Sequence, residues 1–280
     1  MAQIHWFPGH MKKALNELCE SIKIVDVVIE LLDARAPLSS VNEQLNEPTK
    51  NKKKLIVISK PDLADPLQTD KWKQYFINQN NTVLVLDLTK PNASNIIANN
   101  VIKLGQEKWE KQKAKGMKPQ PIRAMIIGVP NVGKSSLINR LAKRKAAGVQ
   151  NKPGYTRGEQ WIKVNKNFLL LDTPGILPMN YDNPKKACNL ALIGSVREEI
   201  LPNTDLVNYL LKNLKEHYPN ALIERFDVDD LNDPKEVCLK IANKRGLLTY
   251  NGEPSIEKAE QLLLKEFKDG LLGRITLEWR

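Results

Sequence analysis

The chain has few of the residues that mark secreted, membrane-spanning or zinc-binding proteins. Its 3 cysteines are scattered over 280 residues, so neither a disulfide framework nor a paired metal or redox site is expected. No apolar run approaches the roughly 20 residues that span a bilayer, and Lys12, Lys13, Glu17 and Glu20 interrupt the start of the chain, so no signal peptide is expected. These absences predict a cytoplasmic protein without a membrane partner.

Acidic residues are scarce in the first two thirds of the chain. Residues 1–179 hold 28 Lys and Arg against 15 Asp and Glu, whereas residues 180–280 hold 15 against 17. The formal net charge of the whole chain is +11, which favours a polyanionic partner. A solvated lysine-rich surface is the alternative interpretation.

Strand and helix patterns alternate up to about residue 178 and then give way to helices alone. Short runs rich in β-branched residues predict buried strands at residues 24–32, 54–58, 82–86 and 122–127, and a hairpin is expected over 161–171. Helices are expected over 11–22, 67–78 and 94 to about 115, and again near 185–200, 203–216, 233–245 and 255–269. The fold class is therefore α/β, with a mostly parallel sheet in a domain over 1–178 and a small all-helical domain over 179–280.

Residues 128–136 form a phosphate-binding loop of the pattern Gly-x4-Gly-Lys-Ser. A predicted strand precedes the loop and a predicted helix follows it, which is the context that separates this motif from a chance match. Backbone N–H groups and the helix start favour a bound phosphate. Lys134 is expected to bridge the β- and γ-phosphates and Ser135 to coordinate Mg²⁺. The predicted nucleotide contacts in this loop are Asn131, Val132, Gly133, Lys134, Ser135 and Ser136.

Two shorter segments after the phosphate loop predict contacts to Mg²⁺ and the γ-phosphate. Asp172 ends a predicted strand and is expected to hold a Mg²⁺-bound water, while the Gly175 N–H senses the γ-phosphate. Thr156 lies in a loop between the two motifs and is the candidate Mg²⁺ ligand of a switch segment. An ordinary glycine turn is the alternative interpretation of that loop.

The segment Ser59-Lys60-Pro61-Asp62, which comes before the phosphate loop, is predicted to be a guanine-reading motif. The Asp62 carboxylate can accept two hydrogen bonds from guanine that adenine cannot offer, and the Lys60 stem can lie over the base. Ser59 stands where the usual motif has Asn or Thr, so an ATPase remains an alternative, as does a simple turn after a strand. In an ordinary small GTPase the guanine motif follows the phosphate loop. The reversed order predicts a circularly permuted P-loop GTPase domain.

The residue that orients the attacking water in many GTPases is missing. That position follows Gly175 and is Ile176, whose apolar side chain cannot orient a water. Another group must therefore take this role, and His10, one of only 3 histidines, is the candidate catalytic residue. A structural role for this histidine is the alternative.

Five segments together closely resemble the bacterial ribosome biogenesis GTPase A family, also called the YlqF family. They are Trp6–Met11, Asp33–Pro37, Lys60–Leu63, Gly128–Ser135 and Asp172–Ile176. The resemblance implies a permuted GTPase domain followed by a helical RNA-binding domain. It also implies a role in late maturation of the large ribosomal subunit.

The resemblance further implies roles for individual residues. His10 would replace the missing glutamine, and Asn131 would bind a stimulating K⁺. Asp87 and Leu88 occupy the place of the remaining base-contacting motif, although they match it poorly.

These observations lead us to expect a GTP-hydrolysing switch, with Lys134, Thr156 and His10 as catalytic residues and Mg²⁺ as cofactor. Its expected partners are the large-subunit precursor and rRNA, and it is expected to be monomeric off the ribosome. The alternative is an RNA-binding assembly module whose nucleotide site is vestigial.

Overall fold

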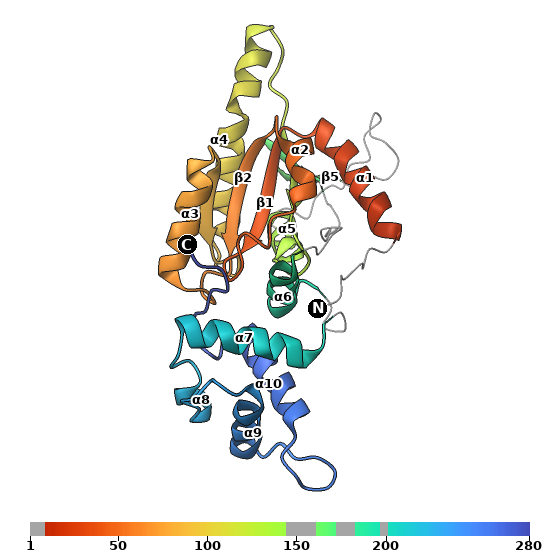
Figure 1. Ribbon diagram of the computed structural model, residues 1–280. Coiled ribbons are helices and arrows are strands. Elements are labelled where there is room, and N and C mark those ends of the chain that lie inside the picture. Colours follow the sequence, from red (N-terminus) through yellow and green to blue (C-terminus); the bar gives the residue numbers. More distant parts are fainter. Residues whose placement is uncertain (1–8, 144–160, 172–182, 197–200) are drawn as a thin grey trace.

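A central sheet with helices on both faces is joined at one end to a group of helices (Figure 1). This computed structural model describes residues 9–143, 161–171, 183–196 and 201–280. Within these ranges no helix combines the length and the apolar character needed to cross a bilayer. The residues that form the sheet all precede residue 172, and the helical group follows it.

Within the described residues the sheet has six strands, which lie where the sequence predicts them, except that the first begins at Val27 because Ile24 is the last residue of a helix. They are β1 (Val27–Asp33), β2 (Lys53–Ser59), β3 (Thr82–Leu86), β4 (Ile122–Ile127), β5 (Trp161–Asn165) and β6 (Phe168–Leu171). Their order is β3-β2-β1-β4-β6-β5, and all neighbouring pairs are parallel except the edge hairpin β5-β6. The chain order reverses direction between β1 and β4, so a ligand site is expected at the carboxyl ends of these two strands.

The helices divide between the sheet and the helical group. Those around the sheet are α1 (Gly9–Ile24), α2 (Asn46–Thr49), α3 (Pro66–Asn78), α4 (Ala93–Ala114) and α5 (Lys134–Lys143), with a 3-10 turn, η1, at Glu43–Leu45. Those of the helical group are α6 (Pro184–Leu192), α7 (Asn203–His217), α8 (Ile223–Phe226), α9 (Pro234–Arg245) and α10 (Ile256–Lys268).

Alternation along β1 explains why helices cover both faces of the sheet. Its odd-numbered residues, Val27, Ile29 and Leu31, share a buried cluster with side chains of α4 and α5. Val28, one of the even-numbered residues, packs with α1, and Leu32 packs with α3. Because successive strand residues point to opposite faces, a strand that is apolar at nearly every position must be covered on both.

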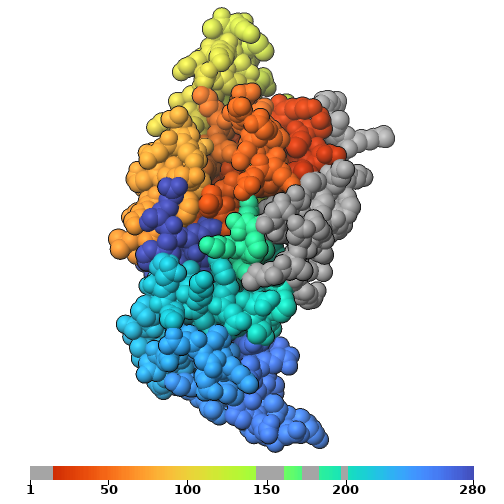
Figure 2. All heavy atoms as spheres, in the orientation of Figure 1, coloured from red at the N-terminus to blue at the C-terminus, as the bar shows by residue number. Residues whose placement is uncertain are grey.

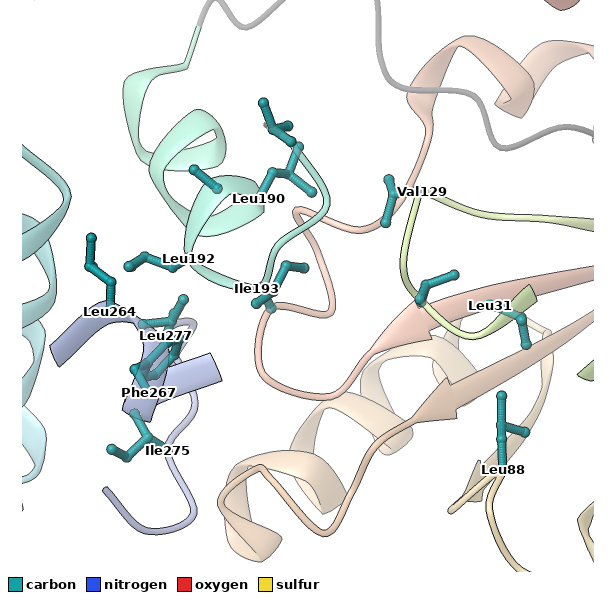
Figure 3. Close-up of a cluster of buried hydrophobic side chains, with 14 of the residues drawn as sticks. Leu31, Leu88, Val129, Leu190, Leu192, Ile193, Leu264, Phe267, Ile275 and Leu277 are labelled. Carbon is teal, nitrogen blue, oxygen red and sulfur yellow. The ribbon is translucent and has the colours of Figure 1, made fainter. Parts of the chain in front are cut away.

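The helical group shares its apolar core with the α/β part of the molecule. A single buried cluster runs from β1 and β4 through Leu190 and Ile193 to Phe267 and Leu277 (Figure 3). Burial of such side chains contributes about 25 cal/mol per Å² of apolar surface. The two parts are therefore held together by apolar burial as well as by polar contacts.

The strap, which we define as residues 274–280, returns from α10 to the α/β part (Figures 1 and 2). The Ile275 N–H donates to the Leu63 carbonyl at 3.1 Å, and the Leu277 N–H donates to the Arg35 carbonyl at 2.8 Å. The Trp72 indole of α3 donates to the Glu278 carbonyl at 2.8 Å. The strap thus contacts two loops. One follows β1 and contains Arg35, and the other follows β2 and contains the predicted guanine motif.

Helix α6 is shorter than the segment 185–200 that the sequence predicts as helical. It ends at Leu192 because Gly194 adopts a left-handed conformation, with φ of 76°, and turns the chain. The predicted hairpin over 161–171 is confirmed, with Lys166 and Asn167 as its turn. The short helices α2 and α8 are absent from the sequence-based prediction.

The packing of α4 on the sheet depends on one glycine. A Cβ added at Gly105 would lie 2.5 to 2.8 Å from three side-chain atoms of Ile122 in β4. Replacement by alanine raises helix propensity by about 1 kcal/mol, but such overpacking costs about 1–3 kcal/mol. We therefore expect Gly105→Ala to lower the free energy of unfolding in urea.

The matched control is Gln106→Ala, an exposed position in the same helix, which should leave stability nearly unchanged. If the clash is the cause, the cost of Gly105→Ala should shrink when Ile122 is also replaced by alanine. An equal cost in both backgrounds would rule the clash out.

Candidate nucleotide-binding site

The phosphate loop lies at the carboxyl end of β4 and its backbone is closely packed against β1. Gly128 has φ of 152°, and a Cβ there would lie 2.7 Å from the Leu31 carbonyl oxygen. Asn131 and Gly133 also have positive φ, of 59° and 108°. Unusual conformations of this kind within a short loop let backbone N–H groups turn toward a common point, which suits an anion at the start of α5.

Lys134 is the first residue of α5 and is almost fully buried, at 7% exposure. Its ammonium donates to the carbonyl oxygens of Gly128 and Val129 at 2.9 and 2.7 Å, so its side chain folds back over the phosphate loop. Burial lowers the pKa of Lys134 to about 8, because the charged form is poorly solvated. When a nucleotide binds, this ammonium can exchange its two carbonyl partners for phosphate oxygens, which carry more negative charge.

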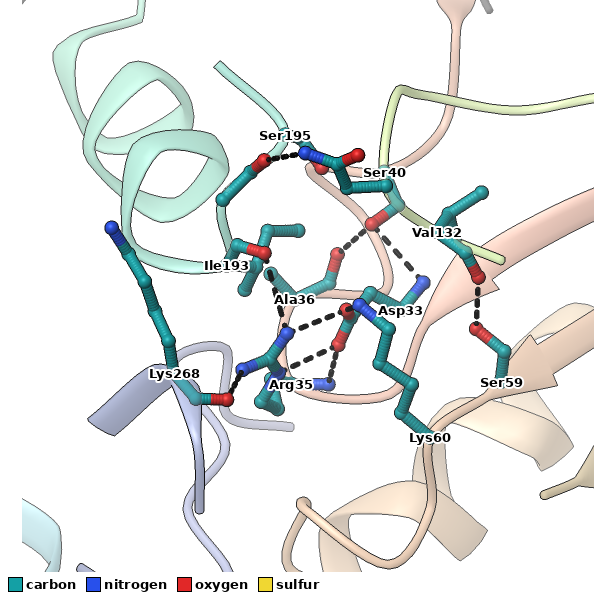
Figure 4. Close-up of polar contacts among 12 residues, drawn as sticks. Asp33, Arg35, Ala36, Ser40, Ser59, Lys60, Val132, Ile193, Ser195 and Lys268 are labelled. Carbon is teal, nitrogen blue, oxygen red and sulfur yellow. Dashed lines mark hydrogen bonds and ion pairs between the residues drawn. The ribbon is translucent and has the colours of Figure 1, made fainter. Parts of the chain in front are cut away.

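The predicted guanine motif is joined directly to the phosphate loop. The Ser59 hydroxyl, which is fully buried, lies 2.9 Å from the Val132 carbonyl and 2.9 Å from the Leu32 carbonyl (Figure 4). Its single proton is shared between these two acceptors. Ser59 therefore fixes the end of β2 against the phosphate loop and is directed away from solvent.

Lys60, the next residue, is held by an acid from the neighbouring strand. Its ammonium lies 2.8 Å from Asp33 Oδ2, and the same carboxylate forms a two-pronged ion pair with Arg35. Burial by itself raises the pKa of Asp33, but the two cations outweigh it and hold the pKa below its usual value. The aspartate is therefore ionised, and both cations stay fixed around it.

The other predicted base contacts lie at the same edge of the sheet. Asp62 follows β2 and is exposed. The Asp87 carboxylate accepts hydrogen bonds from the Thr89 N–H and hydroxyl at 2.8 and 2.6 Å, and those bonds lower its pKa. Leu88 is buried against the phosphate loop, with its Cδ1 3.0 Å from where a Cβ of Gly133 would lie. Asp87 thus shapes a turn, and Leu88 packs on the loop.

Other predicted site residues lie outside the described part of the chain. Thr156, Asp172 and Gly175 are in the ranges that the structure leaves out. His10 is in the first turn of α1, but its side chain is likewise not described. Ser135 and Ser136 are exposed at the start of α5, so the Ser135 hydroxyl offers an oxygen of the kind that Mg²⁺ prefers. Within the described ranges, no three His, Cys, Asp or Glu residues cluster as a metal site.

Two parts of this site were not assigned a role from the sequence. One is the Asp33–Arg35 pair, and the other is the α6 turn, which we define as residues 193–195. The Asn131 amide donates to the Gly194 carbonyl at 2.6 Å, and the Ser195 hydroxyl donates to the Pro130 carbonyl at 2.9 Å. The Asp33–Arg35 pair has a sequence signal, because an acid at the end of a buried strand is followed two residues later by an arginine. The α6 turn has no such local signal.

The fold and the site define a P-loop GTPase in which the predicted guanine motif precedes the phosphate loop. A protein-family model described as "50S ribosome-binding GTPase" matches residues 123–244. Ribosome biogenesis GTPase A of Bacillus pumilus is 40% identical over 276 residues, which cover 98% of both chains. The protein of the same name from Bacillus cereus is 41% identical over 98% of this chain and 93% of its own length. The chain belongs to the ribosome biogenesis GTPase A family, and its substrate is GTP, with Mg²⁺ as the usual cofactor.

A solved structure agrees with this assignment. The GDP-bound structure of TM YlqF has a TM-score of 0.70 and 27% sequence identity, and the match covers 94% of this chain and 98% of that one. The fold is therefore shared with a solved relative along nearly the whole chain.

The pKa of Lys134 makes nucleotide binding depend on pH. Above about pH 8 the buried lysine of the free protein loses its proton, whereas phosphate oxygens favour the charged form. Binding of GDP at pH 9 should therefore take up close to one proton, and binding at pH 7 should take up none through this residue. Calorimetric titrations in two buffers of different ionisation enthalpy measure this number.

Lys134→Arg provides the control, because arginine stays charged across this range and should bind GDP, more weakly, without the uptake. Equal proton uptake at pH 7 and pH 9 in the unmodified protein would contradict the assignment. The burial also costs folding stability below about pH 8, and that cost should fade as the pH rises from 8 toward the ordinary lysine value of 10.5.

Proposed function

We propose that this GTPase is a nucleotide-dependent switch that acts in late maturation of the large ribosomal subunit and binds rRNA on the precursor particle. The main observation in support is that the phosphate loop and the α6 turn are joined directly by hydrogen bonds of Asn131 and Ser195. Through this turn, a change in the phosphate loop reaches the helical group, residues 179–280, which we propose as the ribosome-docking domain. The names of the relatives and of the family model support the ribosomal partner.

We assign the hydrolytic roles by the positions of the motifs. Ser135 and Thr156 would hold Mg²⁺ directly, and Asp172 would hold it through water, with Gly175 sensing the γ-phosphate. Bound Mg²⁺ supplies charge stabilisation to the transferring phosphoryl group. His10 would orient the attacking water, since Ile176 cannot, and the Asn131 side chain would bind K⁺ through its oxygen. Asp62 and Lys60 would select guanine.

The arm, residues 111–118, is the RNA-contacting surface that the structure favours. It comprises the end of α4 and the loop after it, and it projects from the body of the molecule at the end away from the helical group (Figures 1 and 2). Lys113, Lys115 and Lys118 are exposed there, and none has an ion pair within the described part of the chain. Unpaired ammonium groups on a projecting element are free to neutralise phosphates.

Three basic residues in the second half of α9 differ, because acids lie against them. Lys240 pairs with Asp229 at 3.5 Å, and Lys244 pairs with Asp227. Arg245 lies 3.5 Å from Glu266. These pairs neutralise much of the charge that α9 would offer to RNA, so we place the electrostatic contact on the arm.

Charge reversal on the arm should weaken RNA binding in a salt-dependent way. Replacing Lys113, Lys115 and Lys118 by glutamate should remove three phosphate contacts. The negative slope of log K for RNA binding against log salt concentration should then become shallower by about 2–3. The slope is measured with an rRNA fragment by fluorescence anisotropy. The matched control reverses the three paired residues of α9, Lys240, Lys244 and Arg245, and should change the slope less. Equal effects from both triple variants would reject the arm as the main contact.

The function as a whole is tested on ribosomal particles. Co-sedimentation with large-subunit precursors should be strong with a non-hydrolysable GTP analogue and weak with GDP, and added particles should raise GTP turnover. Turnover that particles do not stimulate would reject the coupled switch. Particle binding that ignores the nucleotide, with weak GTP affinity, would instead identify an RNA-binding module with a vestigial nucleotide site.

A further inference from the structure

The Arg35 guanidinium lies where the predicted guanine motif meets the helical group. Its Nε and one Nη bond both oxygens of Asp33, at 2.9 and 2.8 Å. The other Nη donates to the Lys268 carbonyl at the end of α10, at 3.1 Å, and the group also reaches the Ile193 carbonyl at 3.3 Å (Figure 4). With 2% exposure, Arg35 has exchanged its hydration for these four contacts.

Asp33 carries the effect of Arg35 to Lys60. The carboxylate is fully buried, and Lys60 bonds the same Oδ2 atom that Arg35 bonds. The Lys60 backbone has φ of 54°, a left-handed conformation that is uncommon for a lysine. A long, flexible side chain on a strained backbone keeps one position only if its end is held, and Asp33 holds it.

We propose that Arg35 is a positioning residue for guanine-nucleotide binding, which acts through Asp33 on Lys60 and links the base site to α6 and α10. The inference rests on the proposed role of Lys60 at the base. The Arg35 fork sets the orientation of the carboxylate, and the carboxylate sets the position of the Lys60 ammonium. Because the same fork bonds two carbonyls of the helical group, base binding and the placement of α6 and α10 are coupled.

The geometry explains why only arginine serves here. A lysine at position 35 keeps the positive charge, but its single ammonium cannot span both carboxylate oxygens and two carbonyls in a plane. The carboxylate is then free to turn, and Lys60 moves with it. The loop is also held from the opposite side, by the bond from Leu277 to the Arg35 carbonyl, so loss of the fork should not unfold it.

The first experiment compares Arg35→Lys with Arg225→Lys. Arg225 forms an equally two-pronged pair with Glu266 of α10, at 2.7 and 3.0 Å, but does not contact the guanine motif. Affinity for a fluorescent GDP is measured for each variant after its fold is checked by circular dichroism. We expect Arg35→Lys to weaken GDP binding about tenfold and Arg225→Lys to leave it unchanged.

A double-mutant cycle separates positioning from a general loss of structure. In a Lys60→Met background, Arg35→Lys should change GDP affinity by less than about twofold, because the group through which it acts is gone. A full tenfold loss in that background would overturn the inference, as would unchanged affinity in a folded Arg35→Lys protein or in Lys60→Met itself.

Hydrogen exchange of the unmodified protein tests the coupling without any variant. GDP should slow the exchange of amides in residues 193–196 and 269–273, which follow the two carbonyls that Arg35 bonds, since linkage between two sites is reciprocal. No change in these segments on GDP binding would overturn the coupling, even if Arg35→Lys fails to fold. An unmodified protein that binds no GDP would instead sink the proposed function, so the two failures are distinguishable.

Discussion

The structure depends on one buried carboxylate, that of Asp33 at the end of β1. A fully buried ionised group is costly unless cations and hydrogen bonds surround it, and here Arg35 and Lys60 supply both. Each cation belongs to a different loop at the carboxyl edge of the sheet. The carboxylate therefore fixes the loops after β1 and β2 relative to each other, and Arg35 extends that constraint to α6 and α10.

The phosphate loop is tied into the same arrangement by neutral hydrogen bonds. Ser59 links it to the end of β2, and the α6 turn contacts it at Pro130 and Asn131. The predicted base side and the phosphate loop thus both contact one turn of the helical group. This arrangement does not need the motifs in one chain order, because the strands pair by position in the sheet, where β1 lies between β2 and β4.

Much of the α/β part could be predicted from local patterns. The strands ending at Asp33 and Ile127, the helix that begins at Lys134 and the edge hairpin follow from apolar runs, glycines and turn residues. Helix α6 could not be bounded in this way, because apolar spacing continues past Leu192 and only the conformation of Gly194 ends it. The strap was also missed, since an extended segment after a helix has no periodic signature.

The class of site was predictable from the sequence, because a phosphate loop and an acidic base-reading motif need particular residue types at fixed spacing. The permutation was predictable as well, since it is only an order of motifs. The tertiary structure alone decided what Arg35 and Ser195 do, because their partners lie on segments distant in the chain. Contacts of that kind arise from the packing of α6 and α10 on the sheet, and no local pattern encodes them.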